Sequence, residues 1–262
     1  MALDNLTVDR YGDELFEALS CRATVAPLRN RVPGMTIADG YRIQERMVSR
    51  MIAAGDSIVG KKIGVTSRAV QDMMQVFEPD FGQLTASMEH RSGDVLAMNK
   101  MIQPRIEGEI AFVLKQDLTG PGLTAVDVLA ATAHVVPCFE VVDSRIDNWD
   151  IRIQDTVSDN ASCGAYVLGG TPVDPRDVDL SLVGLLIEKN GELAATGVGA
   201  AVQGSPVNAV VWLANRLGAL GVTFRAGELI LSGSLAALVP VAEGDKIIAH
   251  FGGLGHCEVS FQ

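Results

Sequence analysis

Hydrophobic residues recur at helical spacing near the start of the chain and at strand spacing through most of the remainder. Within residues 9–20, Leu15, Phe16 and Leu19 lie on one face of a helix, because residues three and four apart share a face. Prolines at positions 27 and 33, the second followed by glycine, interrupt this pattern. We therefore predict an amphipathic helix over residues 9–20 and a break before residue 36.

A second helix is predicted to begin at Thr36, since threonine favours the N-cap position. Asp39 stands three residues later, where a capping box usually carries glutamate, so the box is imperfect. The helix should end near Gly55. Its apolar face comprises Ile43, Met47, Val48 and Met51. We expect this pair of helices to serve as a cap or an oligomer contact rather than as a chemical site.

From residue 57 onward, short apolar runs alternate with glycine, as in β-strands. Residues 92–96, 226–231 and 243–248 each place glycine and an acidic residue before β-forming residues, which suits a tight turn that leads into a strand. A β-hairpin is predicted where Val183–Lys189 is followed by asparagine and Gly191, because glycine supplies the positive φ.

Two further helices are expected, over residues 124–133 and 206–220, the second with proline in its first turn. The order is therefore helices, then many strands with a few helices inserted. This order is typical of an α+β fold and differs from the regular strand–helix alternation of a doubly wound sheet. We divide the chain into an N-terminal helical segment, residues 1–56, packed on a β-rich catalytic domain, residues 57–262, within a single structural unit.

Composition limits the partners and the location of the protein. With 262 residues and 48 % hydrophobic residues, the chain can bury a sizeable core. A net charge of −11 repels phosphate backbones and anionic lipid, so nucleic acids and membranes are poor partners. The sequence lacks a basic N-terminal region followed by an apolar run, and its four cysteines lack CxxC spacing. We expect a cytoplasmic protein with reduced thiols.

Two glutamates stand two residues apart in a predicted strand over residues 103–114. Side chains two apart in a strand point to the same face, so Glu107 and Glu109 project together beside apolar residues. Glu140 interrupts a second apolar strand. Buried carboxylates so close to one another repel and are costly to bury unless a cation is present.

Three carboxylates without a histidine or cysteine partner suit a hard cation, Mg²⁺ or Mn²⁺ rather than Zn²⁺, and leave positions open for water and substrate. The competing interpretation is a solvated strand face with the acidic residues pointing outward. Glu140 favours the metal site, because it lies inside a second apolar run. Asp143 lies an odd number of residues away and should face the other side of that strand.

Seven short stretches of the sequence match motifs of one protein family. They occur in the order found in that family and span nearly the whole chain. They are Gly60–Ser67, Glu78–Gly82, Gln103–Glu109, Phe139–Arg145, Asp159–Gly164, Gly204–Asn208 and Leu231–Leu235. Each is a weak motif, but the ordered set is specific. In this set the chain resembles the 2-hydroxypenta-2,4-dienoate hydratases (2-oxopent-4-enoate hydratases), which belong to the fumarylacetoacetate-hydrolase-like superfamily.

The resemblance implies a mixed β-sheet wrapped as a roll, with the active site at its mouth and Mg²⁺ or Mn²⁺ on Glu107, Glu109 and Glu140. It also implies a homo-oligomer. Relatives include the 4-oxalocrotonate decarboxylases, which work beside the hydratase and can associate with it, so a decarboxylase is an expected partner.

The implied reaction adds water to 2-hydroxypenta-2,4-dienoate to give 4-hydroxy-2-oxopentanoate, in the meta-cleavage degradation of aromatic compounds. Because water adds to an alkene that is conjugated with a ketone, the dienol must first become the 2-oxo-3-enoate. The proton transfers need an acid and a base. By resemblance and chemical type we assign them to Lys62 and Asp80, leaving open which is the acid. The alternatives are a surface lysine, for which the neighbouring Lys61 is the candidate, and an aspartate that caps a turn.

Four polar residues are candidates for binding the substrate. Asn160, Ser162 and Ser234 lie in glycine-rich stretches and are predicted to bind its carboxylate or carbonyl, with local turn hydrogen bonds as the alternative. Arg105 shares a strand face with Glu107 and is predicted to bind the substrate carboxylate or to pair with a metal-ligating glutamate.

A hydratase that acts on a longer dienedioate stays open, and so do two other functions. One is a 4-oxalocrotonate (2-oxo-3-hexenedioate) decarboxylase of the same family, whose substrate needs a further cation or donor for its far carboxylate. The other is a non-catalytic scaffold subunit of a hydratase–decarboxylase complex. The presence of the three glutamates together with Lys62 and Asp80 argues against the scaffold.

Overall fold

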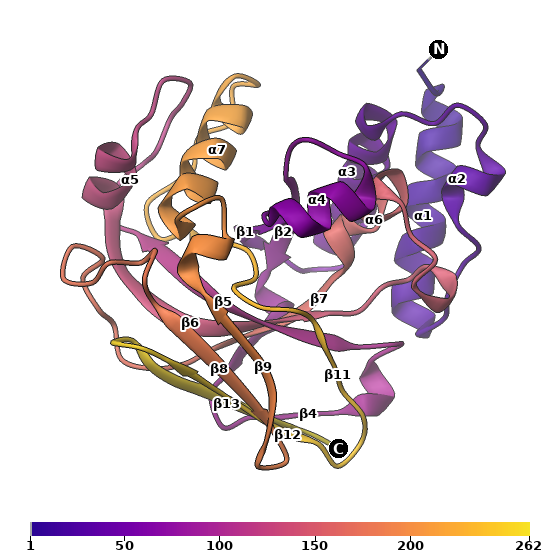
Figure 1. Cartoon of the computed structure of the whole chain (residues 1–262). Coiled ribbons are helices and arrows are strands. Elements are labelled where there is room, and N and C mark those ends of the chain that lie inside the picture. Colours follow the sequence, from indigo (N-terminus) through magenta and orange to yellow (C-terminus); the bar gives the residue numbers. More distant parts are fainter. Residues whose placement is uncertain (1) are drawn as a thin grey trace.

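The fold consists of two mixed β-sheets flanked by helices, as seen in a computed structural model that describes residues 2–262 (Figure 1). The helices are α1 (Asn5–Cys21), α2 (Leu28–Arg31), α3 (Ile37–Ala53), α4 (Arg68–Met74), α5 (Ala125–Ala131), α6 (Ile153–Ser158) and α7 (Pro206–Gly218). The strands are β1 (Ile58–Gly64), β2 (Asp80–Thr85), β3 (Glu89–Arg91), β4 (Val95–Leu96), β5 (Arg105–Leu114), β6 (Thr132–Val142), β7 (Cys163–Leu168), β8 (Gly184–Lys189), β9 (Glu192–Val198), β10 (Leu229–Leu231), β11 (Val239–Pro240), β12 (Lys246–Phe251) and β13 (Gly255–Phe261).

The larger sheet runs in the order β2-β1-β10-β5-β6-β7-β3, with β11 paired to β5. Its pairs β1–β10 and β3–β7 are parallel and the others are antiparallel. The second sheet runs β4-β13-β12-β8-β9. The predicted α+β fold with a mixed β-sheet is confirmed, and the three segments with glycine and an acidic residue do lead into β4, β10 and β12.

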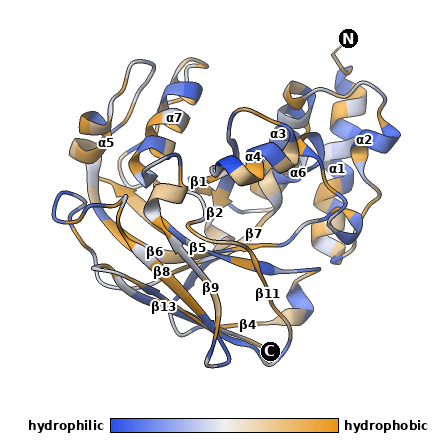
Figure 2. Ribbon diagram, in the orientation of Figure 1, coloured by the Kyte–Doolittle hydropathy of each residue, from blue (hydrophilic) through white to orange (hydrophobic). Residues whose placement is uncertain are grey.

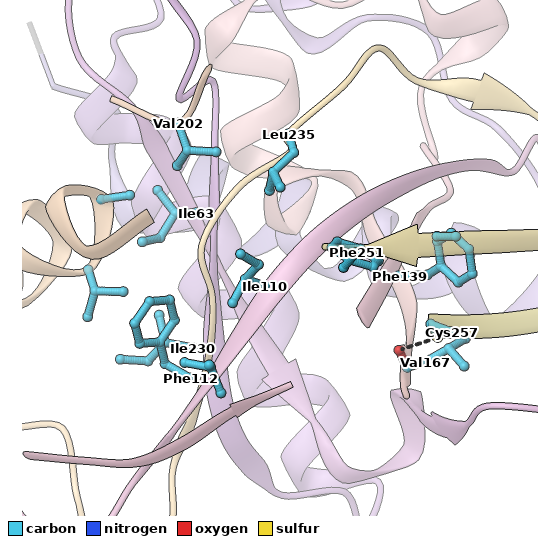
Figure 3. Packing of buried hydrophobic residues seen from close by; sticks show 14 of the residues in the cluster. Ile63, Ile110, Phe112, Phe139, Val167, Val202, Ile230, Leu235, Phe251 and Cys257 are labelled. Atoms are coloured by element: carbon cyan, nitrogen blue, oxygen red, sulfur yellow. Dashed lines mark hydrogen bonds between the residues drawn. The ribbon is translucent and has the colours of Figure 1, made fainter. Parts of the chain in front are cut away.

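The two faces of the larger sheet are covered by different layers, because side chains alternate along each strand. Ile110, Phe112 and Phe139 point into the core shared with the second sheet and α7 (Figure 3). Ala111 and Cys138 point the other way and pack with residues of α3. Figure 1 shows α1 to α4 and α6 grouped on one side of the molecule, while α5 and α7 stand apart from them.

Burial follows the hydrophobic pattern of the sequence. Apolar residues line the central strands, while polar residues concentrate in loops and on the outer helix surfaces (Figure 2). The predicted apolar face of α3 is buried through Ile43, Met47, Val48 and Met51. Within residues 2–262, no helix has the length and apolar character that crossing a membrane requires.

Local signals placed several elements correctly. The capping box at α3 is complete with aspartate, because the Asp39 side chain accepts from the Thr36 backbone N–H and Thr36 Oγ1 accepts from the Asp39 N–H, both at 3.1 Å. The hairpin between β8 and β9 turns through Asn190 and Gly191, both at positive φ.

Two helix boundaries were wrong. Helix α1 begins at Asn5, four residues before the predicted start. The helix predicted over residues 124–133 ends at Ala131, because Thr132 already pairs with Leu114 as the first residue of β6. Pairing with β5 over the next ten residues outweighs the helical pattern at this point. The division of the chain between residues 56 and 57 stays a prediction.

Candidate active site

The three predicted metal ligands converge on one face of the larger sheet. Glu107 on β5 stands directly opposite Glu140 on β6, and Glu109 follows two residues later on the same face. One carboxylate oxygen from each residue lies within 4.8 Å of the other two. Glu109 and Glu140 are fully buried and Glu107 is partly buried. The solvated-strand interpretation is therefore wrong for Glu109 and Glu140.

The donor atoms of this cluster fit a bound cation. Oε1 of Glu109 and both carboxylate oxygens of Glu140 are buried and accept no hydrogen bond from residues 2–262. Oε2 of Glu109 accepts from the backbone N–H of Gly233 at 2.8 Å. Buried carboxylate oxygens without hydrogen bonds are unfavourable, even though the Lys62 amine lies 3.1 Å from Oε1 of Glu140. An all-oxygen site suits Mg²⁺ or Mn²⁺. Hence the residues present fit a hard divalent cation.

The pKa values of Glu107 and Glu109 are raised by their burial and by the repulsion between the carboxylates. Burial, followed by the nearby charge of Glu140, raises the pKa of Glu107 to about 8. The same two causes hold the pKa of Glu109 well above its ordinary value. A divalent cation would offset both effects, because it stabilises the ionised carboxylates.

Lys62 and Asp80 lie beside the three glutamates. The Nζ of Lys62 on β1 lies 3.1 Å from Oε1 of Glu140 and donates a hydrogen bond to the carbonyl oxygen of Ala161 at 2.9 Å. Burial opposes the charged amine, but the charges of Glu140 and Asp80 outweigh it and raise the pKa of Lys62. Burial raises the pKa of Asp80, although the charge of Lys62 partly opposes the shift.

Close packing around Asp80 explains why position 64, within the stretch Gly60–Ser67, is a glycine. Asp80 pairs with Gly64 across β1 and β2. A Cβ atom at Gly64 would lie only 2.2 Å from Oδ1 of Asp80. That oxygen is buried and is free of hydrogen bonds from the described residues, so it is available to a reactant.

Lys61 is not the surface lysine that the sequence suggested. Its side chain points to the opposite face of β1 from Lys62, where its Nζ lies 3.2 Å from Glu228 and 4.6 Å from the ring centroid of Phe224. The residue is only 5 % exposed. The expectation failed because both faces of β1 are covered by other layers, so strand alternation does not bring Lys61 to solvent.

A cavity of about 520 Å³ opens beside these groups. Its polar lining includes Lys62, Asp80, Arg105, Glu107 and Ser162. Its apolar lining includes Val65, Val70, Met73, Met74, Val142, Ile151 and Leu238. The arrangement suits a small anion that has an acidic end and an apolar remainder.

The guanidinium of Arg105 lies over the ring of Trp149 at 4.4 Å from the centroid, so it faces the cavity as a cation stacked on an aromatic ring. Trp149 is fixed in turn, because its Nε1 donates to the carbonyl oxygen of Gln103 at 2.9 Å. Sequence reasoning missed Trp149, since nothing local links it to Arg105.

The other predicted substrate-binding residues differ in position, because Ser162 is among the residues that line the cavity and Asn160 and Ser234 are not. Ser162 lines the cavity, and its Oγ lies 3.3 Å from Oδ2 of Asp159. The side-chain amide of Asn160 accepts from the Gln83 N–H at 2.7 Å and donates to the Gln83 carbonyl at 2.9 Å. Ser234 donates to the Ala236 carbonyl at 2.7 Å. Their roles toward substrate stay predictions.

The sequence did not predict two backbone groups at the site. They are the N–H of Gly233 and the carbonyl of Ala161. Any residue has such groups, so composition carries no signal for them. Gly233 gives one indirect signal, because its φ of +103° favours glycine.

Comparison with known proteins completes the description of the site. The profile of the fumarylacetoacetate (FAA) hydrolase C-terminal family matches residues 52–262. The chain belongs to the fumarylacetoacetate hydrolase family. Within this family it is 53 % identical over 260 residues to a 2-hydroxyhexa-2,4-dienoate hydratase of Comamonas testosteroni, with 98 % of each chain covered.

Two further proteins are similar to this chain. A 2-hydroxypent-2,4-dienoate hydratase of Pseudomonas putida is 57 % identical over 221 residues, which cover 84 % of this chain and all of the relative. The solved structure of 4-oxalocrotonate decarboxylase from Pseudomonas putida G7, complexed with magnesium and adipate, superposes with a TM-score of 0.96 at 38 % identity. That match covers 100 % of this chain and 99 % of the decarboxylase.

Proposed function

We propose that the protein is a metal-dependent hydro-lyase that converts 2-hydroxypenta-2,4-dienoate and water to 4-hydroxy-2-oxopentanoate. The observation that carries this proposal is the convergence of three clustered glutamates with Lys62 and Asp80, beside a cavity that Lys62, Asp80 and Glu107 line. The identity of 53 % and 57 % to two dienoate hydratases supports the same reaction class.

Glu107, Glu109 and Glu140 would hold the cation, Mg²⁺ or Mn²⁺, each through a carboxylate oxygen of the cluster. In Glu109 and Glu140 these include buried oxygens that accept no hydrogen bond from the described residues. When bound, the cation would supply Lewis-acid stabilisation of negative charge that develops on the 2-oxygen and carboxylate of the substrate.

The chemistry requires two proton movements and one addition. The 2-hydroxyl proton leaves and C5 gains a proton, which gives the 2-oxo-3-enoate; water then adds its hydroxyl to C4 and a proton to C3. Lys62 and Asp80 are the two groups assigned to these transfers, because both reach the cavity and both carry polar atoms within the buried site.

Substrate recognition is assigned to the cavity wall. Arg105, held over Trp149, would bind the substrate carboxylate. Ser162 would contact the carbonyl or carboxylate, and Asn160 and Ser234 would act from the loops that carry the neighbouring backbone groups. The apolar wall would accommodate the hydrocarbon end of a dienoate.

A 4-oxalocrotonate decarboxylase is the second candidate. Arg152 lines the cavity and would supply the further cation that a second carboxylate requires. The solved decarboxylase also shares the whole fold at 38 % identity. The higher identity to the hydratases favours the first candidate.

The assembly and location belong to this proposal as well. We expect a homo-oligomer, association with a 4-oxalocrotonate decarboxylase, and a cytoplasmic location in which the four free cysteines stay reduced. Light scattering of the purified protein, alone and mixed with the decarboxylase, measures both assemblies.

The decisive experiment follows the dienol absorbance of 2-hydroxypenta-2,4-dienoate after mixing with purified protein and Mg²⁺, with the product identified by NMR. The proposal expects loss of the dienol and formation of 4-hydroxy-2-oxopentanoate, abolished by EDTA and restored by Mg²⁺ or Mn²⁺. Release of CO₂ from 2-oxohex-3-enedioate, without hydration, would favour the decarboxylase. Activity in neither assay, with no response to metal, would favour the scaffold.

A further inference from the structure

A turn beside the cavity has an uncommon backbone. Asn160, Ala161 and Ser162 have φ values of +51°, +49° and +55°. Three successive residues other than glycine in the left-handed region are unfavourable, because each side chain crowds its own backbone. Such a turn persists only where the surrounding structure holds it in place.

The guanidinium of Arg145 closes this turn from both ends. It donates from Nη1 to the carbonyl oxygens of Asp143, at 2.7 Å, and Cys163, at 2.9 Å. Its Nη2 donates to the carbonyl oxygen of Asp159, and its Nε donates to the carboxylate of the same residue. Arg145 is fully buried, so these bonds form without competition from water.

The carboxylate of Asp159 completes the network. It is also fully buried and pairs with the Arg145 charge. Its Oδ2 accepts from the Arg145 backbone N–H and from the Ser144 hydroxyl, both at 3.0 Å, and lies 3.3 Å from the Ser162 hydroxyl. The charge pair is thus well supplied with hydrogen bonds, as a stable buried pair requires.

The turn connects this network to both residues assigned to proton transfer. The carbonyl oxygen of Ala161 accepts the hydrogen bond from Lys62. The side chain of Asn160 makes two hydrogen bonds to the backbone of Gln83, on the strand that begins with Asp80. A change in the conformation of the turn would therefore move the amine of Lys62 relative to a substrate in the cavity.

We propose that Arg145, through its bonds to Asp159 and the turn at residues 159–162, is a positioning residue that fixes the Lys62 amine for proton transfer. This inference rests on the proposed function of Lys62. Arg145 does not line the cavity among the described residues, so it acts on the reaction through the turn and not by contact with substrate.

The test compares Arg145→Met and the milder Asp159→Asn with the wild type, using kcat, KM for 2-hydroxypenta-2,4-dienoate and the Kd for Mn²⁺. We expect kcat to fall by about 100-fold in Arg145→Met, the lower end of what one proton-transfer group contributes, and by a smaller factor of about 10 in Asp159→Asn, because the amide keeps part of the hydrogen-bond network. The Mn²⁺ Kd should stay within about threefold of wild type, because the metal ligands are left in place, and KM should rise by a smaller factor than kcat falls, because Ser162 lies in the turn but Arg105 does not. Rates are normalised to Mn²⁺-binding sites, so that unfolded protein does not enter kcat.

Asp245→Asn serves as the matched control, because Asp245 is a buried carboxylate with three polar contacts in the second sheet, away from the cavity. It should lower the melting temperature without changing normalised kcat. If Arg145→Met and Asp159→Asn behave in the same way, the positioning role is overturned.

A double variant separates action through Lys62 from action on the site as a whole. Once Lys62→Met has removed the amine, adding Arg145→Met should lower the residual kcat by less than about twofold, because residues that act as a unit are not additive. Additive losses of kcat in the double variant would overturn the inference. Changes in KM and the Mn²⁺ Kd as large as the change in kcat would also overturn it. Failure of the proposed function is a different result, namely no turnover of the dienoate by the wild-type protein with Mg²⁺ or Mn²⁺.

Discussion

The amine of Lys62 lies 3.1 Å from the carboxylate of Glu140, and both side chains are almost completely removed from solvent. This contact joins the proton-transfer group on β1 to the proposed metal ligand on β6. With Asp80, Glu107 and Glu109 nearby, four carboxyl groups surround one amine. This excess of carboxyl groups is the reason that the site would favour a divalent cation.

The two neighbouring lysines of β1 should differ in their effect on turnover. Lys62→Met should lower kcat by about 10²- to 10⁴-fold, the usual contribution of a proton-transfer group. Lys61→Met should keep kcat within about twofold, because its amine pairs with Glu228 on the other face of the strand. Steady-state kinetics on both variants measure the difference, and equal losses would contradict the assignment of Lys62.

Glu109→Gln should remove metal binding while leaving the fold intact. The amide keeps the shape of the side chain but loses the charge, so turnover should fall by about 100-fold or more as the Lewis-acid contribution is lost. The melting temperature in EDTA should rise slightly, since one repulsive carboxylate is gone. Mn²⁺ titration and calorimetry check both effects, with Glu258→Gln in the second sheet as the control. Turnover near the wild-type level at saturating Mg²⁺ would count against Glu109 as a ligand.

The metal-free protein should lose stability as the pH rises. Burial and the charge of Glu140 raise the pKa of Glu107 to about 8 in the folded state, against an ordinary value of 4.5. The folded state therefore binds a proton that the unfolded chain releases, so this contribution is complete below pH 4.5 and is lost as the pH rises through about 8.

Melting temperatures measured across this range in EDTA should fall by several degrees, and saturating Mg²⁺ should remove the trend, because the cation replaces the proton. Glu107→Gln should reduce the slope in EDTA. A metal-free melting temperature that rises over the same range would contradict the shift at Glu107.

Arg105→Met should weaken substrate binding more than it slows the chemistry. The guanidinium over Trp149 is assigned to the substrate carboxylate, and a charge-assisted contact of this kind corresponds to about a 10- to 100-fold increase in KM. The inhibition constant of oxalate should rise in parallel, with kcat less affected. A variant with unchanged KM and oxalate affinity would exclude Arg105 from carboxylate binding.

The sequence by itself determined the features that depend on local spacing. Strand periodicity placed Glu107 and Glu109 on one face, and the same rule turned Asp143 away from Glu140, where it accepts from the backbone N–H groups of Ile102 and Gln103. Cap residues located the start of α3. These features need only the few neighbouring residues that set backbone geometry and side-chain direction.

Tertiary structure alone decided which distant groups meet. The register between β5 and β6 sets Glu107 opposite Glu140, and the layer on the far face of β1 buries Lys61. The carbonyl of Ala161 and the N–H of Gly233 reach the site because Arg145 and the positive φ of Gly233 fix their loops. Pairing register and loop direction arise from contacts between residues far apart in the chain, so no local pattern of residue types encodes them.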